Sequence, residues 1–390
     1  MLLLVGASVR ALLESAVESG FHAMGIDFFG DTDNQGEVVT PYDGYGLSPN
    51  TMNLLTIARD YECSGLVYGA GPENHGQALN FWEERGLLLG NGCEALASVR
   101  NPYLLRDVLE NAGFKMPNFF GTDEFQAVKP QGSWLLKPVF RGGGHGIIKL
   151  SEGGEPEKVI SLLKEPERYI VQENVDGVPA SMTFLSDGAS ALTVGFSRQL
   201  ISEGGEDDPF RYDGNIVPFA DPGSDLWNKM TCLSSVLTKS FGLRGINTLD
   251  FILSRGGVWV LELNPRWSGS SEVIEAWLGK RLFREHVNAC KGELPDSAEW
   301  EEMLGKLPKG YFAKKILYSD DSYNAKNFGE EWKSLFAKGI RDIPRPGFFI
   351  RAGDPICTVL GDGASIDECM QDINSKTHMI HDILLTKGRD

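Results

Sequence analysis

The order of apolar and polar residues along the chain predicts parallel α/β units at its beginning and antiparallel strands further on. Residues 1–8 (MLLLVGAS) form a short apolar run, residues 9–20 have the spacing of an amphipathic helix, and a second apolar run begins at Phe21. This order is typical of the parallel α/β units that bind nucleotides. The G-x-G-x-x-G fingerprint is absent, so we interpret residues 1–92, with a further strand and loop at 65–76, as an α/β domain that supplies structure or a substrate wall.

The middle of the chain changes to a strand-rich pattern. Residues 101–117 predict a helix with an apolar stripe, and residues 133–150 (SWLLKPVFRGGGHGIIKL) predict a strand, a glycine-rich loop and a second strand. Residues 168–200 alternate as strands separated by Asp-Gly turns. Residues 311–390 resume with strands and end in a helix. The apolar stripe of the helix is predicted to comprise Leu104, Leu105, Val108 and Leu109.

Composition narrows the class of protein. A chain of 390 residues exceeds one ordinary core, which predicts two or three subdomains. The net charge of −17 argues against nucleic acid or an anionic membrane as the main partner. Six scattered cysteines show no C-x-x-C pair and no zinc-like spacing, so we expect thiols in a reducing compartment. No signal peptide or membrane span is visible, and we expect a cytoplasmic protein.

Two carboxylates and an amide stand inside apolar runs in residues 243–271. Glu262 and Asn264 are two residues apart, so both side chains share one face of a strand, and a tight hairpin through the intervening residues would bring Asp250 beside them. Three such oxygen donors suit Mg²⁺, with substrate phosphates completing the coordination. The alternative is an amphipathic hairpin whose polar face meets solvent.

The glycine-rich loop and nearby basic residues are candidates for phosphate binding. Four glycines in residues 141–146 leave backbone N–H groups free to cover phosphates, and Lys137 precedes them, although a flexible surface turn would have the same composition. Arg244 and Arg266 flank the three oxygen donors and would stabilise charge on a transferred phosphoryl group, or else pair with the carboxylates. Arg198, Arg211 and Tyr212 are candidates for orienting a small carboxylate, with an ordinary surface loop as the alternative.

Taken in order, these motifs resemble the ATP-grasp superfamily. LLKPVFRGGGHG is similar to its nucleotide lysine and phosphate-covering loop, IVQENVDG to its adenine-binding hinge, and LRGINTLDFIL with VWVLELNPRWSGSS to its arginine, aspartate and E-x-N magnesium signature. The resemblance covers roughly residues 98–290. It implies a fold that is α/β and α+β, with an N-terminal Rossmann-like pre-ATP-grasp domain (1–92), a small subdomain (93–172), a large subdomain with the metal site (173–295) and a strand-rich C-terminal segment (296–390).

The resemblance also implies roles for individual residues. Asp250, Glu262 and Asn264 would hold one or two Mg²⁺ ions, for which Mn²⁺ would substitute, and Arg244 and Arg266 would be catalytic. The superfamily often has a ribose-binding acid where this chain has GVPASM, which leaves Ser181 as the candidate for ribose binding. It also usually has a lysine where this chain has Arg100, which would take the place of that lysine. The implied contacts to ATP are Arg100, Lys137, Gly142, Gly143, Gly144, His145, Gly146, Gln172, Glu173, Val175 and Ser181.

The function implied is an ATP-dependent ligase that joins a carboxylate to an amine through an acyl phosphate and releases ADP and phosphate. The alternatives are an ATP-dependent carboxylase, a small-molecule kinase, or a non-catalytic ATP-binding regulatory protein. VGASVRAL, DFFGD, GAGPEN, SRQL, PFRYDGNIVP and GDPICTV also resemble an uncharacterised carboligase-like branch of the superfamily. That branch suggests a relation to the tyramine-glutamate ligases of methanofuran synthesis. The expected partners are small molecules, with no nucleic acid and no membrane, and a homodimer is compatible with the resemblance.

Overall fold

An N-terminal α/β domain begins the chain. The computed structural model describes residues 1–128, 131–139, 142–150, 156–202, 208–307 and 309–386. The first sheet has the strand order β3-β2-β1-β4 with every pair parallel, as the strand–helix–strand pattern predicted. Its central strands are buried on both faces, which matches their continuous apolar sequence. The elements are β1 (Leu2–Val5), α1 (Arg10–Glu18), β2 (Ala23–Ile26), β3 (Val38–Val39), α2 (Thr51–Ala58), β4 (Gly65–Tyr68) and α3 (Gly76–Glu83).

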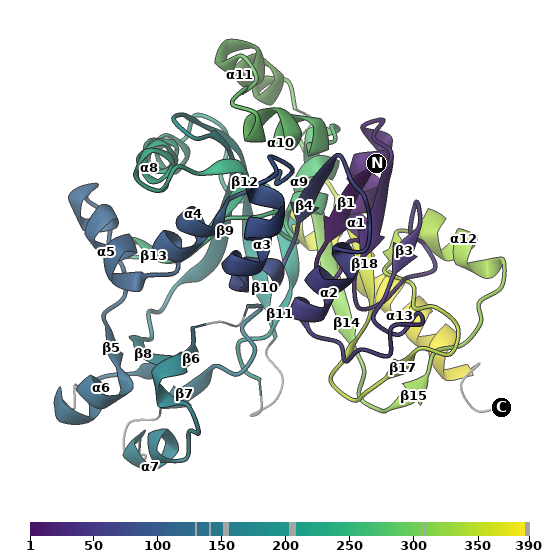
Figure 1. The fold of residues 1–390 in the computed structure, drawn as a ribbon, viewed down its shortest axis with the longest axis horizontal. Helices are drawn as coiled ribbons and strands as arrows, with labels where there is room; N and C mark the ends of the chain where they lie inside the picture. Colours follow the sequence, from purple (N-terminus) through teal and green to yellow (C-terminus); the bar gives the residue numbers. More distant parts are fainter. Residues whose placement is uncertain (129–130, 140–141, 151–155, 203–207, 308, 387–390) are drawn as a thin grey trace.

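A small antiparallel sheet, with the order β5-β8-β6-β7, carries the glycine-rich loop between two of its strands. In Figure 1 it stands apart from the N-terminal domain, next to α6 and α7. The predicted helix after Arg100 is α5, whose first turn is capped by the Asn101 side chain, but Leu104 is exposed and does not join the buried stripe. The elements are α4 (Cys93–Val99), α5 (Pro102–Asn111), β5 (Phe119–Gly121), α6 (Thr122–Val128), β6 (Trp134–Pro138), β7 (Ile148–Leu150), α7 (Pro156–Ser161) and β8 (Tyr169–Glu173).

A large antiparallel sheet forms the centre of the molecule, in the order β13-β12-β9-β10-β11-β14-β18-β16 within the described residues. The strands β14, β18 and β16 come from the C-terminal segment and extend this sheet through the pairing of β11 with β14. The elements from β9 to β14 are β9 (Val178–Asp187), β10 (Ala191–Ile201), β11 (Tyr212–Val217), α8 (Asp225–Phe241), β12 (Arg244–Ser254), β13 (Gly257–Asn264), α9 (Ser271–Leu278), α10 (Phe283–Cys290), α11 (Ser297–Gly305) and β14 (Tyr311–Tyr318).

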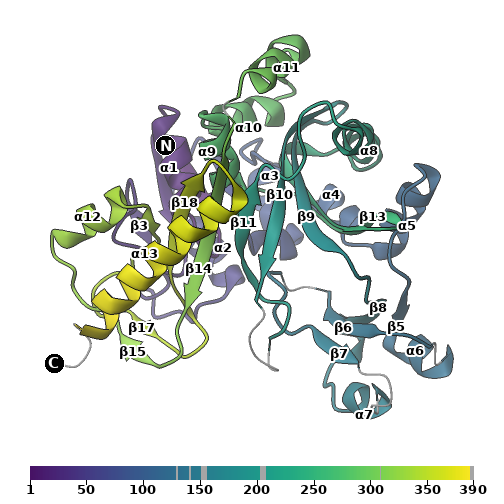
Figure 2. The same ribbon diagram turned by 180° about the vertical axis from the view of Figure 1, so that it is seen from behind.

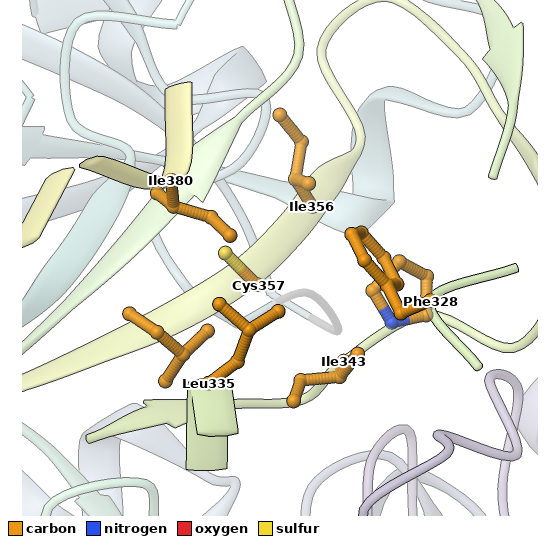
Figure 3. A pocket seen from close by; sticks show the side chains of 8 residues that line it. Phe328, Leu335, Ile343, Ile356, Cys357 and Ile380 are labelled. Carbon is orange, nitrogen blue, oxygen red and sulfur yellow. The ribbon is translucent and has the colours of Figure 1, made fainter. Parts of the chain in front are cut away.

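The C-terminal segment ends in the long helix α13, which crosses β14 and β18 in Figure 2. Between this helix and the sheet lies an apolar cavity of about 10 Å³, lined by side chains that include Leu335, Cys357 and Ile380 (Figure 3). A cavity of that size holds at most about one water molecule, so it is a packing defect of the core. The remaining elements are β15 (Tyr323–Asn324), α12 (Glu331–Ala337), β16 (Ile340–Arg341), β17 (Phe349–Ile350), β18 (Pro355–Gly363) and α13 (Ile366–Thr386).

The mixed helix and strand architecture confirms the fold class predicted from the sequence. None of the helices in the described ranges combines the length and the apolar character that a membrane span requires.

Candidate active site

A cavity of about 570 Å³ lies between the small sheet and the large sheet. Its volume is in the range of sites that bind small molecules and cofactors. The wall comes from β6, the glycine-rich loop, β8 and the strands β9 to β13, and Ala70 adds a contribution from the N-terminal domain. The residues that line it and that the sequence singled out are Lys137, Gly142, Gly143, Gly144, His145, Gln172, Glu173, Val175, Ser181, Tyr212, Asp250, Glu262, Asn264 and Arg266.

Asp250 and Glu262 face each other across the hairpin of β12 and β13. They are directly paired in the strand register, and a bulge follows them. The Asn264 amide donates to Asp250 Oδ2 (2.9 Å) and to Glu262 Oε1 (3.3 Å), and Gln199 Nε2 donates to Asp250 Oδ1 (2.9 Å). Burial, followed by the neighbouring charge of Glu262, raises the pKa of Asp250. Two half-buried carboxylates that face each other across one hairpin therefore favour a compensating cation.

Lys137 supplies part of that compensation. Its Nζ lies 2.6 Å from Glu262 Oε2, although the two residues are in different sheets. Burial alone would raise the pKa of Glu262, but the ammonium group of Lys137 overcomes this effect and lowers it. The lysine near the end of β6 and the carboxylate on β13 therefore meet in the wall of the cavity, where a bound group would contact both.

Arg266 connects Asn264, one of the proposed metal ligands, with Glu73 of the N-terminal domain. Its Nη2 donates to Asn264 Oδ1 (3.3 Å) and its Nε donates to Glu73 Oε1 (2.8 Å). Arg100 approaches the same oxygen, with Nη2 3.6 Å from Glu73 Oε1. Glu73 was not singled out from the sequence. It belongs to the GAGPEN segment, and only the fold brings that segment next to Arg266.

The glycine-rich loop packs against the segment before β11. Tyr212 N donates to Gly143 O (3.0 Å), and His145 Nδ1 lies 2.7 Å from Asp208 Oδ2. Gly144 has a φ of +75°, and an added Cβ there would lie 1.8 Å from Phe210 O. Only glycine fits such a close approach at that φ. The composition of the loop therefore serves both its conformation and its contact with residues 208–212.

One end of the cavity is lined by hydroxyl and amide groups. Ser181 and Ser197 share a hydrogen bond of 2.7 Å, Asn215 Nδ2 donates to Ser197 Oγ (2.8 Å), and the Tyr212 hydroxyl donates to Asn215 Oδ1. A second series of hydrogen bonds joins the hydroxyl groups of Thr248, Ser268 and Ser270, with an oxygen–oxygen distance of 2.8 Å in each bond. Sequence analysis did not identify Gln199, Asn215, Thr248, Ser268 or Ser270. Apart from the period-2 alternation of the strands, no sequence signal marks these positions.

Another part of the cavity wall combines apolar side chains with one unsatisfied amide. Leu135, Ile201, Ile252 and Leu261 line it. The Gln172 side chain is buried at 3% exposure, and its Nε2 has no hydrogen-bond partner among the described residues. A buried donor without a partner costs free energy, so this amide is suited to an acceptor on a flat, apolar ligand.

Two predicted arginines do not reach the cavity, and their assignments are corrected here. Arg244 lies six residues before Asp250, a spacing that puts both side chains on one face of a regular strand, but Gly245 has a φ of +68° and breaks the alternation. The Arg244 guanidinium is directed to Cys290 O (3.2 Å) instead. Arg198 alternates with Ser197 and Gln199, which both belong to the polar network of the cavity, so its side chain is exposed on the other face.

Three further candidates adjoin the cavity without lining it. The Arg211 guanidinium stacks on the Tyr318 ring at 3.8 Å and lies 3.4 Å from Asp213 Oδ1, so it supports the segment before β11. Gly146 turns the chain at the end of the glycine-rich loop with a φ of +74°. Arg100 is held by Glu73, and its Nε is buried without a hydrogen-bond partner in the described part of the chain.

Comparison with known protein families matches residues 99–270 to the ATP-grasp domain. We therefore identify this part of the chain as an ATP-grasp domain, which confirms the resemblance found in the sequence.

Two relatives illustrate what this chain is similar to in sequence. An uncharacterized protein of Methanocaldococcus jannaschii is 24% identical over 372 residues, which is 92% of this chain and 87% of the relative. The D-alanine–D-alanine ligase of Fusobacterium nucleatum is 23% identical over 228 residues, or 57% of this chain and 77% of the relative.

A solved structure shows the same fold. It is the biotin carboxylase domain of the Hydrogenobacter thermophilus 2-oxoglutarate carboxylase, in complex with MgADP, ADP and bicarbonate. Its TM-score is 0.68 at 14% identity, covering 92% of this chain and 85% of that chain.

Proposed function

We propose that this protein is an ATP-dependent ligase that joins a small-molecule carboxylate to an amine through an acyl phosphate, releasing ADP and phosphate. The observation that carries the proposal is the convergence of Lys137, Asp250 and Glu262 on one cavity beneath the glycine-rich loop. This combination of a cation, paired carboxylates and a glycine-rich loop is suited to a metal-bound triphosphate.

The nucleotide would occupy the cavity with its base at the apolar end. Leu135, Ile252 and Leu261 offer flat apolar contact, and the unpaired Gln172 Nε2 offers a donor to a ring nitrogen. Lys137 and the backbone of Gly142, Gly143 and Gly144 would contact the phosphates. Glu173, Val175 and Ser181 line the same cavity and complete the proposed nucleotide site.

The residues present fit a divalent cation. Asp250 and Glu262 are adjacent across one hairpin, and Asn264 lies beside both, with Nδ2 donating to each carboxylate. Rotation of this amide would turn Oδ1 from Arg266 toward the cation. Hard oxygen donors of this kind suit Mg²⁺, which would neutralise phosphate charge when bound, and Mn²⁺ is the natural substitute. The ammonium group of Lys137 would then leave Glu262 and turn to the phosphates.

The chemistry requires no nucleophile from the protein. A substrate carboxylate oxygen attacks the γ-phosphorus of ATP, the bond to the β–γ bridging oxygen breaks, and ADP leaves with that electron pair. The nitrogen of a neutral amine then attacks the acyl carbon, phosphate leaves, and the nitrogen gives up one proton to the departing phosphate. Positioning and charge neutralisation dominate such transfers. Arg266 lines the cavity beside Asn264 and would stabilise the charge that develops.

The proposed acceptor end is the hydroxyl-rich wall around Tyr212, Asn215 and Ser270. Its groups are neutral donors and acceptors, which suits the orientation of a polar small molecule. A place in one-carbon cofactor synthesis follows only from the resemblance to the carboligase-like branch. The domain boundaries, the cytoplasmic location and a homodimer also remain predictions.

The test is to incubate the protein with ATP, Mg²⁺, hydroxylamine and pools of carboxylates that include glutamate, with tyramine among the amines in a parallel series. We expect hydroxamate and ADP in equal amounts. AMP formation, or a phosphorylated alcohol, would overturn the acyl-phosphate mechanism. Asp250→Ala and Glu262→Ala should each abolish turnover while the circular dichroism spectrum stays native.

A further inference from the structure

Glu73 is a buried carboxylate of the N-terminal domain that contacts two arginines of the ATP-grasp domain. It lies in a short 3-10 helix, Pro72–Asn74, directly after β4, and is 5% exposed. Oε1 accepts from Arg266 Nε at 2.8 Å and lies 3.6 Å from Arg100 Nη2. Oε2 accepts from the N–H of Gly71. The carboxylate is therefore held by its own backbone on one side and by two guanidinium groups on the other.

The contacts of Arg266 show that the Glu73 carboxylate sets the orientation of its guanidinium group. Among the described residues its guanidinium donates to Glu73 through Nε, to Trp267 O through Nη1 (3.2 Å) and to Asn264 Oδ1 through Nη2 (3.3 Å). Guanidinium is planar and carries five N–H donors, so fixing Nε sets the direction of both Nη groups. Nη2 reaches Asn264 in the wall of the cavity, beside Asp250 and Glu262.

Charge makes the carboxylate necessary for this arrangement. Arg100 and Arg266 both approach one oxygen of Glu73, and both act electrostatically on Glu262. Two half-buried guanidinium groups without a carboxylate between them would repel one another. Arg266 would then be free to turn away from Asn264.

We propose that Glu73 is a positioning residue that directs Arg266 at the terminal phosphate of the bound nucleotide, so that the N-terminal domain completes the catalytic site of the ATP-grasp domain. This inference rests on the proposed function, because it requires a nucleotide in the cavity. Glu73 itself does not touch the reacting atoms.

The experiment measures two affinities by calorimetry with intact protein: that for MgADP and that for the Mg²⁺ complex of the β,γ-imido analogue of ATP. The affinity for the analogue divided by the affinity for MgADP reports the contacts made to the terminal phosphate. We expect Glu73→Gln to leave the MgADP affinity within about twofold of wild type and to lower the ratio about tenfold, the size of one charge-assisted contact. Glu73→Asp, which keeps the charge, should recover part of the ratio. Arg266→Ala should lower the ratio as much, and the double variant no further.

The matched control is Glu275→Gln. Glu275 is another buried carboxylate at a domain junction, bonded to Ser15, Leu282 N and Arg281, but it lies outside the cavity. It should alter the melting temperature without changing the ratio. A wild-type ratio in Glu73→Gln, or an equal loss in Glu275→Gln, would overturn the positioning role. Absence of MgADP binding in the wild type would instead refute the proposed function.

Discussion

His286 is a buried titratable side chain that the proposed chemistry does not use. It is 2% exposed, its Nδ1 accepts from Ile246 N (2.9 Å), and its Nε2 lies 3.1 Å from Leu89 O. An Nδ1 that accepts a hydrogen bond belongs to a neutral ring, and burial lowers the pKa of His286 to about 4. This residue therefore contributes to the pH dependence of stability.

Acidification should therefore destabilise the protein through His286. Between pH 6.5 and 4 the unfolded chain binds a proton that the folded ring does not, so the stability present above pH 6.5 is lost as the pH falls, by about 3 kcal/mol. His286→Asn should remove this part of the pH dependence in urea unfolding at pH 7.5 and 4.5. The exposed His22→Asn is the control. If the unfolding free energy of His286→Asn changed between the two pH values as much as that of wild type, His286 would not be the source of this pH dependence.

At the level of single residues, the sequence predicted side chains whose position follows from strand periodicity. Glu262, Asn264 and Asp250 meet because a two-residue spacing and a hairpin fix them. Arg244 and Arg198 were predicted as site residues but do not line the cavity. The left-handed Gly245 interrupts the strand beside Arg244, and Arg198 lies on the strand face opposite to Ser197 and Gln199. Glu73 was missed because nothing local to it indicates Arg266.

At the level of elements, the glycine-rich loop is defined by its contact with residues 208–212. Gly144→Ala would place a Cβ 1.8 Å from Phe210 O at a φ of +75°, whereas a Cβ on Gly142 meets nothing within 4 Å. We expect Gly144→Ala to displace the loop and weaken MgATP binding about tenfold or more, as loss of preorganised phosphate contacts would. Gly142→Ala should bind within about threefold of wild type. Fluorescence titration measures both, and equal affinities would show that the contact is immaterial.

Which elements the sequence predicted depended on whether they carry local signals. The strand β6, the glycine-rich loop and the hairpin of β12 and β13 have glycine turns and alternation, and they were recognised. The helix α8 was not, although Ser224 caps its first turn and Gly242 ends it with a φ of +62°. The packing of the loop against residues 208–212 has no local signal, because the two segments are more than 60 positions apart.

At the level of the whole molecule, a buried ion network joins three parts of the chain. Arg10 of α1 is 1% exposed and donates to Glu14 (2.8 Å), to Asp342 (3.0 Å) and to Glu272 of α9. Lys314 of β14 donates to the other oxygen of Glu272 at 2.9 Å. The fold class was readable from the sequence, but this junction was not, because its members are up to 332 positions apart.

Arg10→Met should be strongly destabilising because it removes the cation that Glu14, Glu272 and Asp342 share. Loss of one partner from such a network typically costs about 3–5 kcal/mol. Lys306→Met, which removes a cation from an exposed pair with Glu302, should change stability by less than about 0.5 kcal/mol. Urea unfolding at pH 7.5 distinguishes the two, and an Arg10→Met midpoint equal to wild type would show that the network does not hold the parts together.

The central claim is that Asp250 and Glu262 hold a divalent cation on a nucleotide in the cavity beneath the glycine-rich loop. Calorimetric titration with ATP, with and without Mg²⁺, tests it directly in wild type and in Asp250→Asn/Glu262→Gln. The account predicts one ATP per chain, bound at least about tenfold more tightly with Mg²⁺ in the wild type. It also predicts that the double variant is indifferent to Mg²⁺. Mg²⁺-independent binding in both proteins, or no binding in either, would contradict it.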